Sequence, residues 1–171
     1  MGQRHSEYER IPGDFYATPA WVTDALLSVE KFTPEIYAPC VGEGHIIRAL
    51  RDHGYVVCPG EGDFLNEWDV QDCDIVTNPP YGRLAEECVR HAIQITDDKV
   101  AMLLPMAWDA AKTRRDLFEW KGFRAKYVLT TRIRWENLPQ KSAGPSSNHA
   151  WYVWSHRHVG PPIMGWLPCK E

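Results

Sequence analysis

The 171-residue sequence predicts an α/β protein with a mostly parallel, twisted sheet and helices on both of its faces. Three observations lead to this fold class. Short apolar runs of strand length alternate with segments whose apolar residues recur at helical spacing. A glycine-containing turn joins the first of these runs to a helix. The last two runs have no helix between them, which indicates an antiparallel pair of strands near the C-terminus.

The first expected elements are a helix, a strand and a second helix. Residues 18–29 carry apolar side chains at helical spacing, with Thr18 as the expected N-cap and Pro19 as the expected first helical residue. Residues 35–38 read as a short buried strand. Residues 45–53 follow the glycine turn as a helix.

The central part of the chain continues this alternation. Residues 55–58 are a second strand that a Pro-Gly pair ends, and residues 74–77 are a third strand. Residues 84–95 are amphipathic and helical, and residues 100–104 form another buried strand. Residues 108–120 are expected to be a helix.

The C-terminal part supplies the expected antiparallel pair, residues 125–131 and 150–154. The polar loop between them mixes basic and aromatic side chains with Pro, Gly and Ser, a composition suited to an adaptable binding loop. The loop side chains that we expect to contact a ligand are Arg132, Arg134, Lys141, Asn148 and His149.

The composition is that of an ordinary globular domain, with 44% apolar and 25% charged residues. The net charge of -4 argues against a uniformly basic nucleic-acid coat protein, although it leaves room for a local basic groove. The five cysteines form no C-x-x-C pair, and no run approaches the length of a membrane span. We therefore expect no metal site and no membrane contact, and a reducing, cytoplasmic location.

The segment PCVGEGH, residues 39–45, lies between a strand and a helix. Gly42 and Gly44 permit positive φ and let a ligand lie close to the backbone. The third glycine of the dinucleotide-binding fingerprint is missing. The segment therefore indicates either a plain tight turn or a site for a different ligand.

The segment TNPPYG, residues 77–82, follows the third strand. Pro79 and Pro80 hold the chain extended and have no N–H to donate. The side-chain oxygen of Asn78 and the carbonyl of Pro79 are then acceptors with fixed directions, and Tyr81 adds a flat face for stacking. This set suits a planar NH₂ group such as that of adenine, and it needs neither a metal nor an activated nucleophile. A plain strand-ending turn is the alternative.

The order of these motifs resembles that of amino-methyltransferases that use S-adenosylmethionine. The segment DFYATPAWVTDALL comes first, PCVGEGH second and NPPYG third, which is similar to the gamma arrangement of DNA N6-adenine methyltransferases. The late segment PSSNHAWYVW resembles the end of the small phage and bacterial members. The resemblance covers residues 14–167 and implies a Rossmann-like methyltransferase fold.

The resemblance implies transfer of a methyl group from S-adenosylmethionine to N6 of a flipped adenine in DNA. Asn78, Pro79, Pro80 and Tyr81 would be the catalytic residues, and the late loop would contact DNA. We expect a flexible arm over residues 1–13, then one catalytic domain without a separate recognition domain, acting as a monomer or weak homodimer in a bacterial or phage-infected cell. The residues assigned to the cofactor are Tyr16, Thr18, Pro19, Ala38, Pro39, Cys40, Gly42, Gly44, His45, Glu61, Asp63, Phe64 and Asn78.

Two positions depart from the pattern of this family. Ala38 stands where members usually carry an acidic residue that helps to hold the cofactor, and the connection after the second strand is short. Glu61 is a candidate for binding the ribose hydroxyls, and Glu43 for replacing the missing acid. Two alternative functions follow: methylation of another planar NH₂ group, in RNA adenine or protein glutamine, or a catalytically weak or inactive nucleic-acid-binding scaffold.

Overall fold

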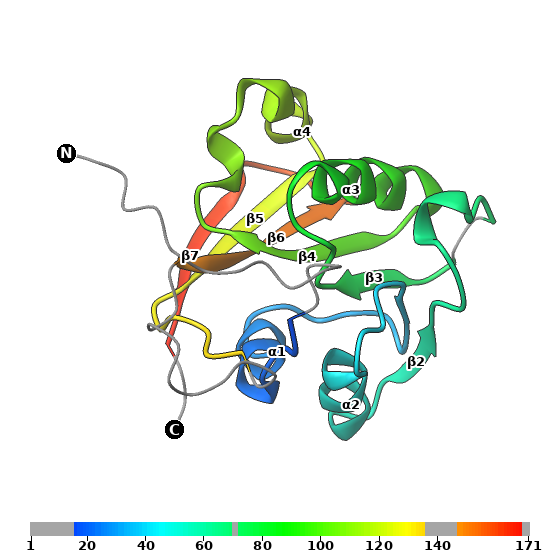
Figure 1. Ribbon diagram of the computed structural model, residues 1–171. Coiled ribbons are helices and arrows are strands. Elements are labelled where there is room, and N and C mark those ends of the chain that lie inside the picture. The colour runs from blue at the N-terminus through cyan, green and yellow to red at the C-terminus, as the bar shows by residue number, and fades with distance from the viewer. Residues whose placement is uncertain (1–15, 70–71, 136–146, 169–171) are drawn as a thin grey trace.

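The computed structural model describes residues 16–69, 72–135 and 147–168, and within them seven strands form one sheet (Figure 1). The strand order is β2-β1-β3-β4-β6-β5-β7. The expected arm, residues 1–13, lies outside the described residues. The strands are β1 (Glu35–Ala38), β2 (Val56–Pro59), β3 (Asp74–Thr77), β4 (Lys99–Pro105), β5 (Phe123–Leu129), β6 (His149–Ser155) and β7 (Ile163–Leu167).

Strand β6 runs antiparallel to both of its neighbours, β4 and β5, whereas the other described strand pairs are parallel. The expected antiparallel pair is thus confirmed as β5 and β6. Strand β7 has no counterpart in the sequence prediction. It pairs in parallel with β5 along its whole length, and Gly165 in its centre weakened the local strand pattern.

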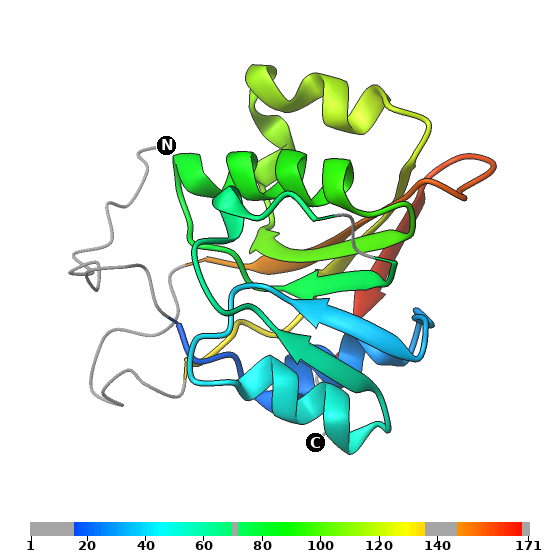
Figure 2. The same cartoon turned by 90° about the vertical axis from the view of Figure 1, so that its right-hand side faces the viewer.

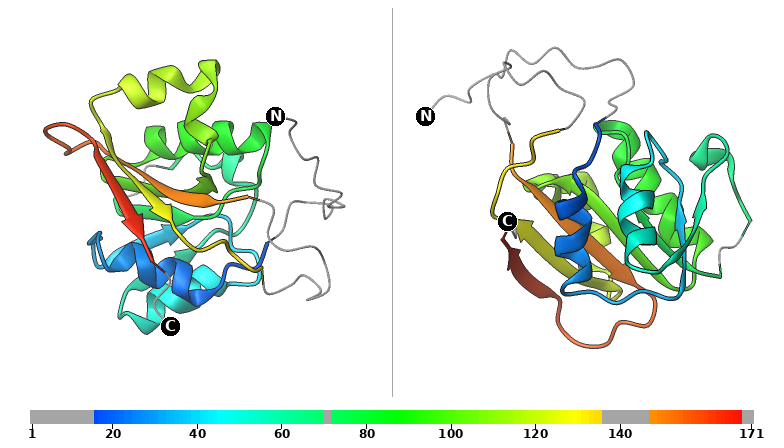
Figure 3. Two further views of the ribbon diagram at one scale, coloured as in Figure 1. Left: turned by 90° about the vertical axis from the view of Figure 1, so that its left-hand side faces the viewer. Right: turned by 90° about the horizontal axis from the view of Figure 1, so that it is seen from below.

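Helices cover both faces of the sheet, as the sequence predicts. Helices α1 (Ala20–Leu27) and α2 (His45–Asp52) lie on one face, and α3 (Arg83–Ile95) and α4 (Arg115–Glu119) lie on the other (Figures 1 and 2). The view from below shows α1 and α2 side by side (Figure 3). Alternation along each strand divides the interior into two apolar clusters. In β1, Ile36 belongs to the α1–α2 cluster and Tyr37 to the α3–α4 cluster.

The expectation of a helix over residues 108–120 was wrong. The segment forms two short 3-10 turns, Trp108–Ala110 and Lys112–Arg114, and only then the single-turn helix α4. Trp108 is 5% exposed and packs in the core, and its carbonyl accepts a hydrogen bond from the Arg114 guanidinium at 2.8 Å. That carbonyl would otherwise accept the N–H four residues later in a continuous helix.

The strand order reverses direction at β1, because β2 lies on one side of it and β3 on the other. The chain therefore leaves β1 and β3 in opposite directions, towards α2 on one face and α3 on the other, which opens a crevice beyond their carboxyl ends. Among the described residues, no helix is both long and apolar enough to cross a bilayer.

Candidate functional site

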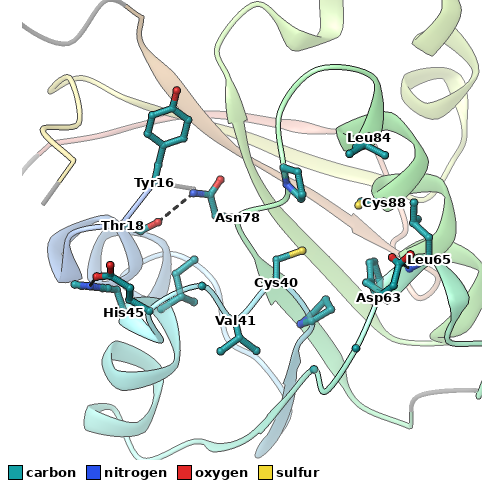
Figure 4. Close-up of a pocket in the computed structure, with 18 of the residues that line it drawn as sticks. Tyr16, Thr18, Cys40, Val41, His45, Asp63, Leu65, Asn78, Leu84 and Cys88 are labelled. Atoms are coloured by element: carbon teal, nitrogen blue, oxygen red, sulfur yellow. Dashed lines mark hydrogen bonds and ion pairs between the residues drawn. The ribbon is translucent and has the colours of Figure 1, made fainter. Parts of the chain in front are cut away.

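A cavity of about 440 Å³ lies beyond the carboxyl ends of β1 and β3 (Figure 4). Its walls come from four stretches: the segment before α1, the glycine turn, the connection after β2, and the loop after β3 with the first turns of α3. Chain segments far apart in sequence thus converge on one crevice. The residues assigned to the cofactor that line it are Tyr16, Thr18, Pro39, Cys40, Gly42, His45, Glu61, Asp63, Phe64 and Asn78.

The glycine turn is held by backbone geometry that requires glycine at two points. Gly44 has a φ of 75° and precedes α2, and its N–H donates to the carbonyl of Val41 at 2.8 Å. Gly60, in the connection after β2, lies so close that a Cβ there would be 2.4 Å from the carbonyl oxygen of Pro39. The short connection after β2 therefore packs directly on the glycine turn and forms one wall of the cavity.

Three residues assigned to the cofactor, Pro19, Ala38 and Gly44, are not among the described residues that line the cavity. Ala38 is 2% exposed and ends β1, and its carbonyl accepts a hydrogen bond from the Gly60 N–H at 3.1 Å. A methyl side chain at this buried position supplies no charge to the cavity. Three acidic residues, Glu43, Glu61 and Asp63, line the cavity.

The Glu43 carboxylate is 3.2 Å from Nε2 of His45, which also lines the cavity. The Asp63 side chain accepts a hydrogen bond from the N–H of Leu65 at 3.2 Å and so orders the turn after it. Phe64 is 5% exposed and packs between Tyr37 and His91, with ring centroids 6.2 and 4.9 Å away. Phe64 therefore touches the cavity from the core instead of standing free in it.

The loop after β3 is tied to its surroundings by hydrogen bonds. The hydroxyl of Thr77 accepts a bond from the N–H of Cys40 at 3.1 Å, which joins the two loops that flank the crevice. The side-chain amide nitrogen of Asn78 donates to the Thr18 hydroxyl at 3.2 Å (Figure 4). This contact also corrects the expectation for Thr18, since α1 begins after Pro19 without a side-chain cap.

The oxygen end of the Asn78 amide, unlike the nitrogen end, makes no hydrogen bond within the described residues. This oxygen, Oδ1, is buried. Because buried acceptors are normally paired, an orphan carbonyl oxygen in a crevice is a candidate for binding a donor from outside the protein. The Thr18 hydroxyl pairs with the nitrogen end of the amide, which leaves Oδ1 as the unpaired end.

Four aromatic rings gather beside Asn78. Tyr81 stacks on Tyr16 with centroids 5.4 Å apart, and the His149 ring lies 5.7 Å from Tyr81. Trp135 contacts Tyr16 at 5.1 Å and His149 at 5.2 Å. The cluster therefore joins four separate parts of the chain, and it gives the NPPY segment an apolar, flat neighbourhood.

The structure corrects the expected role of His149. Its side chain is 3% exposed, so the first residue of β6 is buried and does not present itself to a ligand at the surface. Burial lowers the pKa of His149 to about 4, against an opposing contact with the carbonyl of Ser147. The imidazole is therefore neutral, and it supports Tyr81.

Three other loop residues, Arg132, Arg134 and Asn148, are more exposed than His149. Arg132 donates to Oδ1 of Asn148 at 3.0 Å, and Arg134 is exposed. These side chains lie on the segments that flank the aromatic cluster. Lys141 lies outside the described residues.

Several residues of the cavity wall were not anticipated from the sequence, among them Leu84 and Cys88. They lie four residues apart on α3, so they project from the same side of that helix. The sequence offered one indication of their position, because α3 directly follows the NPPY segment and its first turns therefore lie near the crevice. Helical spacing alone, however, assigns both side chains to the core.

Several solved structures with a similar fold are described as methyltransferases. A candidate class I S-adenosylmethionine-dependent methyltransferase from Listeria monocytogenes superposes with a TM-score of 0.64 at 11% identity, over 96% of this chain and 68% of that one. The 23S rRNA methyltransferase ErmE gives 0.59 at 15% identity, over 88% and 72%. The M protein of the type I restriction enzyme EcoKI gives 0.52 at 16% identity, over 81% and 44%.

These likenesses confirm the predicted Rossmann-like methyltransferase fold. No family model matches the chain, and no curated protein matches it in sequence.

Proposed function

We propose that this protein transfers a methyl group from S-adenosylmethionine to the N6 amino group of adenine in DNA. The proposal joins three supports: the methyltransferase fold, the crevice at the strand ends, and the arrangement of the NPPY segment. The choice of DNA rests on the resemblance of the motif order to the DNA N6-adenine methyltransferases.

The observation that carries the proposal is the buried, unpartnered Oδ1 of Asn78. An amino group attached to an aromatic ring is a poor nucleophile, because its lone pair is delocalised into the ring. An acceptor that binds one N–H draws the nitrogen towards a tetrahedral geometry and returns the lone pair to it. Asn78 can play this part because the Thr18 hydroxyl already occupies the donor end of the amide.

The cavity residues fit the proposed cofactor. S-Adenosylmethionine, when bound, supplies an electrophilic methyl group. The backbone of the glycine turn permits close approach, and the carboxylates of Glu43 and Glu61 are suited to accept hydrogen bonds from ribose hydroxyls. Tyr16, Thr18 and Asn78 form the end of the cavity next to the aromatic cluster. The acceptor would enter from that side, and the aromatic rings would exclude water from it.

A nucleobase suits this neighbourhood better than a glutamine side chain. Tyr81 and Trp135 offer flat faces, and stacking of a base on an aromatic side chain is worth about 1–3 kcal/mol. The exposed Arg134 lies two residues beyond Arg132, where both can meet phosphates. A glutamine amide has no comparable surface to stack.

The test is transfer of radiolabelled methyl groups to duplex DNA, single-stranded DNA, structured RNA and a protein extract. We expect label in DNA with the wild type, and background levels with Asn78→Ala. The circular dichroism spectrum should be close to wild type in that variant, which separates lost transfer from lost folding. Methyl transfer by Asn78→Ala at the wild-type rate would contradict the proposed role of the amide.

If only RNA or only protein is labelled, the substrate is that class of molecule and not DNA. Ala38 in place of the usual acid motivates the competing reading of an inactive nucleic-acid-binding scaffold. Absence of any cofactor binding at millimolar concentration, together with retained binding to nucleic acid, would favour that reading.

A further inference from the structure

Two cysteines face each other across one end of the cavity. Cys40 belongs to the glycine turn after β1, and Cys88 lies on the second turn of α3. Both line the cavity, and Figure 4 shows their sulfur atoms pointing towards each other. The two residues stand on opposite walls of the crevice and belong to segments that are 48 residues apart, from 40 to 88.

The two thiols affect each other's pKa. The neighbouring Cys88 thiol lowers the pKa of Cys40, and the Thr77 hydroxyl acts in the same direction, against the effect of burial. The Cys40 thiol beside it and burial raise the pKa of Cys88. Cys40 is therefore the member of the pair that more readily becomes a thiolate, the reactive form of cysteine.

We propose that Cys40 and Cys88 form a reversible disulfide, a modification site inside the cofactor cavity. Their sulfur atoms face each other across one end of the cavity, so a disulfide would form where the two side chains already converge. The Cys40 backbone is held by its hydrogen bond to Thr77 Oγ1 at 3.1 Å.

The oxidant is a peroxide, and the reaction takes place in two steps. The Cys40 thiolate attacks one oxygen of hydrogen peroxide, so that an S–O bond forms, the O–O bond breaks and hydroxide leaves as water after taking up a proton. The Cys88 sulfur then attacks the resulting sulfenic acid. An S–S bond forms, the S–O bond breaks and a second water leaves. Two thiols lose two electrons in total, and the peroxide gains them.

The other described cysteines are placed differently. Cys58 is exposed on β2, and Cys73 is buried with its pKa raised to about 11, mainly by burial. Neither lines the cavity. Cys169 lies outside the described residues. Cys58 is therefore a suitable control for oxidation at a site unrelated to the cavity.

The bond would change the cavity, because it links the glycine turn to α3 and narrows the space between them. If the proposed function is right, oxidation excludes S-adenosylmethionine, and bound cofactor shields the thiols. Methyl transfer would then stop under peroxide stress and resume after reduction. This consequence rests on the proposed function, whereas formation of the disulfide does not.

The experiment treats the full chain with hydrogen peroxide and maps disulfides by mass spectrometry of non-reduced peptides. We expect a Cys40–Cys88 link in the wild type and in Cys58→Ser, none in Cys88→Ser, and slower formation with S-adenosylhomocysteine present. Calorimetry should show S-adenosylhomocysteine binding weakened about tenfold or more by oxidation and restored by dithiothreitol.

Wild-type protein that keeps both thiols, or links Cys40 only to other cysteines, overturns the disulfide. A Cys40–Cys88 link that leaves ligand affinity unchanged overturns its control over the cavity. A protein that forms the link but binds no ligand even when reduced speaks against the proposed function and leaves the disulfide intact. The two failures are thus distinguishable.

Discussion

The side-chain amide of Asn78 donates to the hydroxyl of Thr18 across 60 positions of sequence, with a nitrogen-to-oxygen distance of 3.2 Å. This bond joins the loop after β3 to the segment before α1. It also holds the Asn78 side chain in place, with Oδ1 as the end that has no partner among the described residues. Thr18 is therefore a positioning residue for the proposed chemistry.

Thr18→Val preserves the shape of the side chain and removes the hydroxyl. We expect kcat for methyl transfer to fall about tenfold, the worth of one hydrogen bond of about 1.4 kcal/mol. The KM for the acceptor should change less than kcat, because the aromatic cluster is untouched. Initial rates measure both, and Thr18→Ser is the matched control that restores the hydroxyl. An unchanged kcat in Thr18→Val would argue against positioning.

The Tyr81 ring is the proposed stacking surface for the base. Tyr81→Ala should raise the KM for the nucleic-acid acceptor about tenfold or more, since base stacking contributes about 1–3 kcal/mol. Tyr81→Phe should behave like the wild type, because it keeps the ring. Tyr16 stacks on Tyr81 at 5.4 Å, so it has to move aside for a base on that face. Equal KM values for the Ala and Phe variants would contradict stacking.

His149 should make stability depend on pH. Its folded-state pKa of about 4 lies below the ordinary value of 6.5, so the unfolded chain takes up the proton first as the pH falls. Its contribution is complete above pH 6.5 and is lost between pH 6.5 and 4, at a total of about 3 kcal/mol. Chemical denaturation between pH 7 and 5 should show this slope, and His149→Phe should flatten it. The same slope in both proteins would rule out His149 as its source.

A buried charge network lies at the end of the sheet opposite the cavity. The carboxylate of Glu30, 1% exposed, accepts hydrogen bonds from Lys99 at 2.8 Å, Arg124 at 2.9 Å and Tyr127 at 2.7 Å. Glu30→Gln leaves the two cations without their counter-charge, and we expect a loss of about 3–5 kcal/mol in unfolding free energy.

Urea denaturation measures this loss. The matched control is Glu119→Gln, which breaks an exposed pair with Arg115 and should cost less than about 1 kcal/mol. A similar loss of unfolding free energy in the two variants would show that burial of the network does not increase its contribution to stability.

Much of the architecture could be predicted because its signals are local. Apolar runs marked β1, β3, β4 and β6, and helical spacing marked α2 and α3 within one residue at each end. Prediction failed where tertiary contacts compete with local preference. The segment after β4 has a helical pattern, but the burial of Trp108 and its contact with Arg114 divide it. Strand β7 exists because β5 offers an edge to pair with.

The candidate site divides in the same way. Chain order and residue type were enough to identify the glycine turn, the NPPY segment and the crevice they flank, because steric limits on glycine and proline act within a few residues. Three further facts were decided only by folding: the Thr18 bond that orients Asn78, the burial of His149, and the meeting of Cys40 with Cys88. Each depends on segments that are distant in sequence, and a local pattern holds no information about which distant groups the fold will bring together.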